Sequence, residues 1–219
     1  MRYLDRADAG RELAARLKQY RADEPLVLGL LRGGIVPAAE VAAALGAPLD
    51  GLVVRKVGVP GHAELAMGAV AAGTIWLNEP LIAQLGIPRR VVDQAVAAEA
   101  KEVERREAVF RRGRPAPSVE GRTVILVDDG LATGATAIAG LRVLRRRGAR
   151  RLIFAAPVCS PEGHERIERE ADDVVCAASP PDFTAVGQAY VSFPQVGDDA
   201  VREYLDAAPA GQAEAGGPR

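Results

Sequence analysis

Two adjacent acids, Asp128 and Asp129, are the side chains of this sequence best placed to do chemistry. They follow an unbroken aliphatic run, Val124 to Val127, which predicts a strand buried on both faces of a parallel sheet. In open α/β sheets, ligands bind at the edge where such strands end. We therefore expect the two carboxylates to face a ligand site.

The residues that follow the acids indicate what this ligand is. A loop of small and hydroxyl-bearing residues leads into a helical pattern, and such a loop leaves backbone N–H groups pointing outward, where a phosphate can bind. Two carboxylates would repel a bare polyphosphate, but they can accept hydrogen bonds from vicinal sugar hydroxyls. The pattern therefore predicts a site for a phosphorylated sugar. The loop residues are Leu131, Ala132, Thr133, Gly134, Ala135 and Thr136.

Two other phosphate-binding motifs do not match this stretch. A Walker loop needs Gly-Lys-Ser/Thr, and position 135 is alanine, so no lysine is available. A dinucleotide fingerprint, Gly-x-Gly-x-x-Gly, is not found early in the chain. A plain buried strand with an acidic turn would need neither the paired acids nor the small-residue loop for its packing.

The run from Val124 to Thr136 resembles the signature of the type I phosphoribosyltransferases, which is an apolar strand, two acids and a loop ending in Thr-Gly-small-Thr. The resemblance implies that Asp128 and Asp129 hold the ribose hydroxyls of phosphoribosyl pyrophosphate (PRPP), and that the loop from Leu131 to Thr136 holds its 5′-phosphate. Strands also alternate with helical patterns along the chain. We expect an α/β fold, with a parallel sheet of about five strands, helices on both faces and a small hood.

A second group of residues is expected at the same sheet edge. The first predicted strand, Leu26 to Leu31, ends in Arg32, Gly33 and Gly34, where glycines allow close backbone approach to a ligand and Arg32 adds a planar cation. The resemblance implies that this loop binds the pyrophosphate of PRPP, often through a cis peptide. Lys56 ends a second predicted strand, 50–57, and is either a further pyrophosphate ligand and catalytic residue or a solvated strand end.

Two further segments are candidates for parts of the site. The stretch from Gly58 to Gly68 matches by position the mobile loop of the family, with His62 as a possible general acid or only a polar loop residue. Tyr190 and Phe193 belong to a cluster of aromatic residues near the C-terminus, in a chain with few of them. They could stack on a planar base, or simply pack in a last strand, 190–193.

These assignments predict a phosphoribosyltransferase that moves the 5-phosphoribosyl group of PRPP to a nitrogenous base and releases Mg-pyrophosphate. Mg²⁺ is expected to bind through the oxygens of PRPP, with Asp129 touching it through water. The acceptor base stays open, because Ala132 stands where hypoxanthine–guanine members carry an acid and adenine-type members carry alanine. The alternatives are a PRPP-binding sensor that transfers nothing and an unrelated phosphosugar enzyme.

The composition of the chain limits the classes of binding partner and the cell compartment that we expect. The chain has 219 residues and a formal net charge of −1, which gives no reason to expect nucleic acid or an anionic membrane. No apolar run is long enough to span a bilayer and the N-terminus does not resemble a signal peptide, so we expect a cytoplasmic protein.

Cys159 and Cys176 each lie in an apolar run, which favours buried free thiols over a disulfide or a metal site.

The predicted organisation is a single domain, 1–207, followed by a disordered tail, 208–219, rich in alanine, glycine and proline. The hood is expected from 78–118, from 183–207, or from both. The longest helical pattern, 88–112, has only a broken apolar stripe, which suits a solvated helix or an interface. A homodimer or a higher homo-oligomer is expected.

Overall fold

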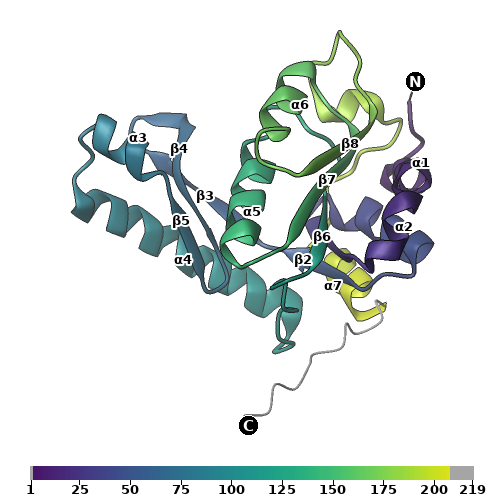
Figure 1. Cartoon of the computed structure of the whole chain (residues 1–219), viewed down its shortest axis with the longest axis horizontal. Coiled ribbons are helices and arrows are strands. Elements are labelled where there is room, and N and C mark those ends of the chain that lie inside the picture. The colour runs from purple at the N-terminus through teal and green to yellow at the C-terminus, as the bar shows by residue number, and fades with distance from the viewer. Residues whose placement is uncertain (1, 208–219) are drawn as a thin grey trace.

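A five-stranded parallel sheet forms the centre of the protein in the computed structural model, which describes residues 2–207 apart from the side chains of 63 and 64. The strand order is β2-β1-β6-β7-β8, and every neighbouring pair is parallel. The sheet lies on the right of Figure 1. The expected α/β architecture is therefore confirmed. The strands are β1 (Leu26–Leu30), β2 (Leu49–Leu52), β6 (Thr123–Val127), β7 (Arg151–Val158) and β8 (Asp173–Ala178).

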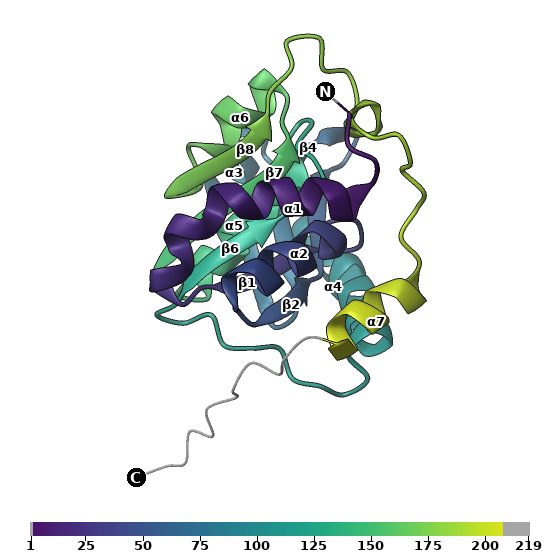
Figure 2. The ribbon, with the colours of Figure 1, turned by 90° about the vertical axis from the view of Figure 1, so that its right-hand side faces the viewer.

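Helices cover both faces of this sheet. Figure 2 shows α1 (Arg6–Leu17) and α2 (Ile35–Leu45) in front of the strands, with α5 (Ala135–Arg146) and α6 (Pro161–Ile167) behind them. All five residues of β6 are buried, as the unbroken aliphatic run predicts. Alternate residues along the strands pack into two core clusters, one against each helical layer. The sheet edge that holds the two acids is thus set on a rigid core.

Local sequence signals account for the ends of these helices. Gly46 ends α2 in the left-handed conformation, with φ of 65°. Ser160 begins α6, because its side chain accepts a hydrogen bond from the Gly163 N–H at 2.9 Å and Pro161 occupies the first turn. A short 3₁₀ segment, Lys18–Asp23, continues from α1.

A second unit, which we call the antiparallel unit (residues 54–111), projects to the left in Figure 1. It consists of the strands β3 (Val54–Val59), β4 (His62–Ala71) and β5 (Thr74–Leu77), followed by the helices α3 (Glu79–Gln84) and α4 (Arg89–Arg111). The three strands pair in the order β3-β4-β5, and both pairs are antiparallel. The β4–β5 hairpin turns at Ala72-Gly73, and the long helix predicted over 88–112 is confirmed.

Two predictions in this region are wrong. The single strand expected over 50–57 is divided at Val53, and its halves belong to different sheets, β2 and β3. The loop expected from Gly58 to Gly68 is instead a β-hairpin that turns at Pro60-Gly61. Both errors concern β3, which leaves the parallel sheet after Val53 and pairs with β4, the strand that follows it across the turn at Pro60-Gly61.

The antiparallel unit is attached to the rest of the molecule by arginines and by apolar contacts. Arg111, at the end of α4, donates to Asp50 of β2 at 2.7 Å. Arg147, just after α5, donates to the carbonyl of Ala72 and, at 3.0 Å, to the hydroxyl of Thr74. These contacts anchor the unit far from the segment that carries the acids.

The C-terminal part of the chain crosses the open edge of the sheet before its last helix. We call residues 183–196 the strap; Figure 2 shows this stretch along the right-hand side, above α7 (Asp198–Ala207). The strand predicted over 190–193 is wrong, because only one isolated bridge, Tyr3 with Tyr190, forms there. The strap contains one 3₁₀ turn, Val186–Ala189.

The predicted disordered tail lies outside the described residues. No helix among the described residues is long and apolar enough to cross a membrane.

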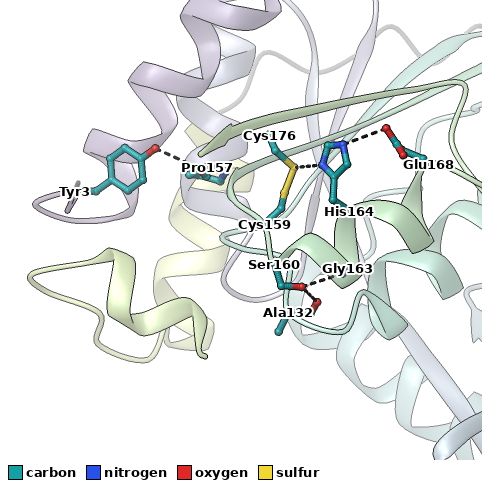
Figure 3. The surroundings of a disulfide bond; sticks show 9 residues. All are labelled: Tyr3, Ala132, Pro157, Cys159, Ser160, Gly163, His164, Glu168 and Cys176. Carbon is teal, nitrogen blue, oxygen red and sulfur yellow. Dashed lines mark hydrogen bonds and ion pairs between the residues drawn. A yellow bond between two sulfur atoms is a disulfide. The ribbon is translucent and has the colours of Figure 1, made fainter. Parts of the chain in front are cut away.

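The expectation of free thiols is also wrong, because Cys159 and Cys176 form a disulfide (Figure 3). Cys176 lies in β8, and Cys159 directly follows β7, its parallel neighbour. This pairing leaves their Cα atoms 6.1 Å apart, within the range that a disulfide spans. The two cysteines are 17 positions apart in the chain, so only the strand pairing reveals that they are neighbours.

Candidate active site

The two acids and the glycine loop after β1 meet at one sheet edge. Asp128 and Asp129 follow β6, whereas Gly33 and Gly34 follow the neighbouring strand β1. A Cβ atom on Gly33 would lie 2.0 Å from the Asp129 Oδ2 atom, and one on Gly34 would lie 2.5 Å from the Val127 carbonyl oxygen. Neither position therefore accommodates a side chain without movement, and the two predicted segments form a single site.

The glycine loop begins with a cis peptide bond between Leu31 and Arg32. The Arg32 guanidinium extends towards α7, where it donates to the Asp198 carboxylate at 3.2 Å. About a third of its side chain is exposed. Arg32 thus contributes its backbone next to the acids, while its charge lies at the outer side of the site.

The loop after the acids is held by the connection between β7 and α6. Leu131 pairs with Cys159 in a parallel bridge, and the Ser160 hydroxyl donates to the Ala132 carbonyl at 2.6 Å. Gly134 has φ of 74° and begins α5. Within the described residues, the N–H groups of Ala132, Thr133 and Gly134 donate to no protein acceptor. They can therefore bind an anion at the N-terminus of α5.

Arg6 contacts Asp129 from the first helix, although the two residues are 123 positions apart. Its Nε atom donates to Asp129 Oδ2 at 2.7 Å, and Nη1 donates to the Pro194 carbonyl at 2.7 Å. Its guanidinium carbon lies 3.6 Å from the centre of the Phe193 ring. The Arg6 side chain is 9% exposed. This buried cation therefore orients Asp129 and fixes the strap.

Tyr190 supports the same acid from the strap. Its hydroxyl donates to the Asp129 carbonyl oxygen, and its ring stacks on Phe193 with centres 4.7 Å apart. Burial raises the pKa of the Tyr190 hydroxyl, and the negative charge of Asp129 adds to this effect. Because Tyr190 is 3% exposed, with its ring packed against Phe193 and Tyr3, it offers no open face to a base. The stacking predicted for Tyr190 is therefore wrong, whereas Phe193 remains half-buried at the site.

The two acids differ in their surroundings. Burial raises the pKa of the Asp128 carboxyl well above its usual range, and the charge of Asp129 raises it further, while Arg6 acts in the opposite direction. The Asp129 N–H donates to Asp128 Oδ1 at 2.9 Å. Asp129 has an arginine partner and Asp128 has none among the described residues. The pair can therefore carry less than its full double charge, which lowers the repulsion of a phosphorylated ligand.

A cavity of about 410 Å³ lies between the glycine loop, the acids and the strap. Its lining includes Arg6, Arg32, Gly33, Asp129, Phe193 and Gln195. The lining thus combines one acid, two cations and one aromatic side chain.

Comparison with known proteins identifies the family. Residues 2–192 match the phosphoribosyl transferase domain. The chain belongs to this family. It is 46% identical, over 97% of its length, to a Mycobacterium tuberculosis protein named "Putative phosphoribosyl transferase Rv0571c", and it spans 48% of that protein. It is 36% identical to the uracil phosphoribosyltransferase of Staphylococcus haemolyticus over 80 residues, which are 36% of this chain and 38% of that enzyme.

One solved structure resembles this phosphoribosyl transferase domain over nearly its whole length. The crystal structure of TT1426 from Thermus thermophilus has a TM-score of 0.87 and 43% sequence identity, and the match covers 94% of this chain and 98% of that one. The chain spans about half the length of the Mycobacterium relative.

Two residues predicted for the site lie in the antiparallel unit of this phosphoribosyl transferase domain. Lys56 lies in β3 opposite Ala69, is half-buried, and does not line the cavity beside Asp129. His62 begins β4 and is exposed at the hairpin turn. The structure thus brings together the acids, the glycine loop and the phosphate loop, and it leaves Lys56 and His62 apart from them.

Sequence reasoning missed Arg6, which is the closest cationic partner of the acids. Nothing in its neighbourhood distinguishes it from the many other arginines of the chain. The available signal was indirect, because two adjacent acids at a buried strand end require a nearby cation or a raised pKa.

Proposed function

We propose that this phosphoribosyl transferase domain transfers the 5-phosphoribosyl group of PRPP to a nitrogenous base and releases pyrophosphate. The observation that carries the proposal is the convergence of Gly33 with Asp129, beside a loop with unpaired N–H groups. A ligand with a phosphate at one end of a ribose and a pyrophosphate at the other matches these two loops, with the acids between them. Family membership supports the same class of reaction.

Each segment has a distinct role in this proposal. Asp128 and Asp129 accept hydrogen bonds from the ribose hydroxyls, and the loop from Leu131 to Thr136 binds the 5′-phosphate. Gly33 and Gly34 let the backbone approach the pyrophosphate, with Arg32 supplying positive charge nearby. The base would occupy the cavity next to Phe193 and attack the anomeric carbon as the pyrophosphate departs.

The donor set is suitable for Mg²⁺, which prefers hard oxygen ligands and retains several waters. Arg6 engages Oδ2 of Asp129, while no hydrogen bond among the described residues engages Oδ1. Asp129 could therefore contact a hydrated ion held mainly by PRPP. When bound, Mg²⁺ would neutralise charge on the departing pyrophosphate.

Lys56 is proposed to act only after the antiparallel unit approaches the site. The antiparallel unit is anchored at its far side, through Arg111 of α4 and through Arg147 at the β4–β5 turn, and the described residues of β3 form no hydrogen bond to the acids. Movement of the β3–β4 hairpin over the ligand would bring a cation to the pyrophosphate. It would also exclude water from a ribosyl cation that water would otherwise hydrolyse.

One observation favours the alternative of a PRPP sensor without transferase activity. Arg6 already occupies an oxygen of Asp129 that a ribose hydroxyl could use. The sensor would bind PRPP while leaving every base unreacted.

A panel of purine and pyrimidine bases, including uracil, tests the proposal with PRPP and Mg²⁺. Release of pyrophosphate that depends on one base, and that is lost in the Asp128→Asn and Asp129→Asn double variant, supports the transferase. Tight PRPP binding with no base turned over supports the sensor. If ribose 5-phosphate binds as tightly as PRPP, the pyrophosphate loop is misassigned and the protein is another kind of phosphosugar-binding domain.

A further inference from the structure

A cluster of two cysteines and one histidine lies outside the cavity described above. Cys159, His164 and Cys176 come from the end of β7, from α6 and from β8, and Figure 3 shows the histidine ring beside the sulfur atoms. One possible ligand atom from each residue lies within 4.8 Å of the other two. We propose that the reduced protein binds one Zn²⁺ ion, or a similar thiolate-preferring ion, through these three side chains.

The donor atoms match the chemistry of zinc. Two thiolates and one imidazole form a frequent protein ligand set for Zn²⁺, which leaves a fourth position for water. Ligand lengths of about 2.3 Å to sulfur and 2.0 Å to nitrogen place tetrahedral donors roughly 3.5–3.8 Å apart. The His164 Nδ1 atom lies 3.4 Å from the Cys176 sulfur, close to this spacing. Once the bond between the sulfurs is broken, side-chain rotation of the cysteines can open the space for the ion.

The second nitrogen of the histidine has the partner expected of a metal ligand. His164 Nε2 lies 3.1 Å from Glu168 Oε1, one helical turn further along. Histidines that bind metals commonly donate their other N–H to a carboxylate, which orients the ring and fixes the tautomer. Here the carboxylate directs the lone pair of Nδ1 towards the sulfurs. This contact involves neither cysteine, so it supports the site independently of the sulfur geometry.

The burial of the three side chains suits a metal site that is open to solvent on one side only. Cys159 is fully buried, whereas His164 and Cys176 are half-buried, so an ion could enter from the side of the histidine. Two thiolates and a divalent cation sum to zero charge, which is compatible with the surrounding apolar core. Ser160 caps α6 and thereby places His164 on the first turns of the helix, next to the strand ends.

The oxidised and metal-bound forms are alternatives for the same two sulfurs. A dithiol reductant donates two electrons, so that the Cys159–Cys176 bond becomes two thiols and the reductant becomes a disulfide. Binding of the ion then displaces the two thiol protons. Because Cys159 pairs with Leu131, the ion would brace the strand end on which the phosphate loop rests.

Cobalt substitution tests the site without using PRPP or any base. The full chain is reduced with a dithiol, freed of metal, and titrated with Co²⁺ and then Zn²⁺. We expect one Co²⁺ per chain with a thiolate-to-metal absorption that Zn²⁺ abolishes, and no binding by the oxidised protein. Glu168→Gln should weaken binding about 10- to 100-fold, and His164→Ala should weaken it further.

His62→Ala is the matched control, because His62 is the other histidine of the chain and is exposed at a hairpin turn. It should bind Co²⁺ as the parent does. Cys159→Ser should abolish the absorption. If serine at this buried position prevents folding, His164→Ala still tests the site, because His164 is only half-buried. The proposal is overturned if the reduced parent shows no thiolate-to-metal band, or if His164→Ala and the parent have equal affinity. Neither result depends on transferase activity, so the two proposals can fail separately.

Discussion

The strap and the antiparallel unit both lie beyond the parallel sheet, but they are attached to it in opposite ways. The strap is joined to Asp129 by polar contacts through Arg6 and Tyr190. The antiparallel unit is tied down at its far side, where Arg111 meets Asp50. This difference shows that the acids are positioned by contacts from α1 and the strap, whereas the described side chains of residues 54–111 make no hydrogen bond to them.

The contrast also predicts different kinds of defect. A change in the strap or in Arg6 should damage the folded protein, because it leaves buried charges or polar groups unpaired. A change at the β3–β4 hairpin should damage turnover and leave the fold intact. Four substitutions test this division, beginning with the largest expected effect.

Arg6→Met should lower the free energy of unfolding by about 3–5 kcal/mol, because removing one partner of a buried ion pair leaves the other charge uncompensated. Chemical denaturation at neutral pH measures this loss. Arg89→Met is the matched control, since Arg89 and its partner Asp93 are more than half exposed, and a change below about 1 kcal/mol is expected. Equal losses in the two variants would show that Arg6 does not anchor the strap.

Asp128→Asn should weaken PRPP binding roughly 10- to 100-fold, because hydrogen bonds to a charged acceptor contribute about 1.5–3 kcal/mol. Isothermal titration calorimetry with PRPP and Mg²⁺ measures this loss. Asp93→Asn, on the exposed part of α4, should leave the affinity unchanged. Parent-like affinity in Asp128→Asn would remove the acids from the ribose site.

The same Asp128→Asn variant should be more stable than the parent at neutral pH. Burial raises the pKa of Asp128 in the folded state, so the folded protein binds this proton more tightly than the unfolded chain does. The parent therefore loses stability as the pH rises through the folded pKa, and the asparagine variant does not. Thermal unfolding from acid to neutral pH should show a difference that grows with pH. A constant difference would contradict the raised pKa.

Lys56→Met should lower kcat at least tenfold while changing the free energy of unfolding by less than about 0.5 kcal/mol, as for substitutions away from buried networks. PRPP affinity measured without a base should stay close to that of the parent. Lys101→Met, on α4, is a control that removes an exposed lysine of the same unit. A parent-like kcat for Lys56→Met would exclude the lysine from the reaction.

Tyr190→Phe should have the smallest effect, a loss of about 1 kcal/mol in unfolding free energy, because one hydrogen bond to the Asp129 carbonyl is removed while the ring packing is kept. Tyr204→Phe is the control, because the Tyr204 hydroxyl forms no hydrogen bond among the described residues. This substitution should change the unfolding free energy by less than about 0.5 kcal/mol. A loss in Tyr190→Phe no greater than in Tyr204→Phe would show that the strap holds Asp129 through Arg6 alone.

The parts of the fold that were predicted from sequence are those encoded by neighbouring residues. β6 was predicted because every residue from Val124 to Val127 is apolar, and the start of α6 likewise depends on neighbouring residues, with Ser160 as the cap and Pro161 in the first turn. The division at Val53 was not predicted, because one continuous β pattern can contribute to two sheets when its second half pairs with a strand that lies outside the first sheet. The disulfide was missed for the same reason, since it depends on the pairing of β7 with β8.

The sequence by itself determined the acids, the loop from Leu131 to Thr136 and the glycine turn at Gly33, because each is a short run in which chemistry and backbone conformation depend on adjacent residues. Only the tertiary structure decided that Arg6 reaches Asp129, that Tyr190 supports the acid, and that Lys56 stands apart. These relations join residues far apart in the chain, and they are set by how helices and strands pack around a shared core rather than by any local pattern.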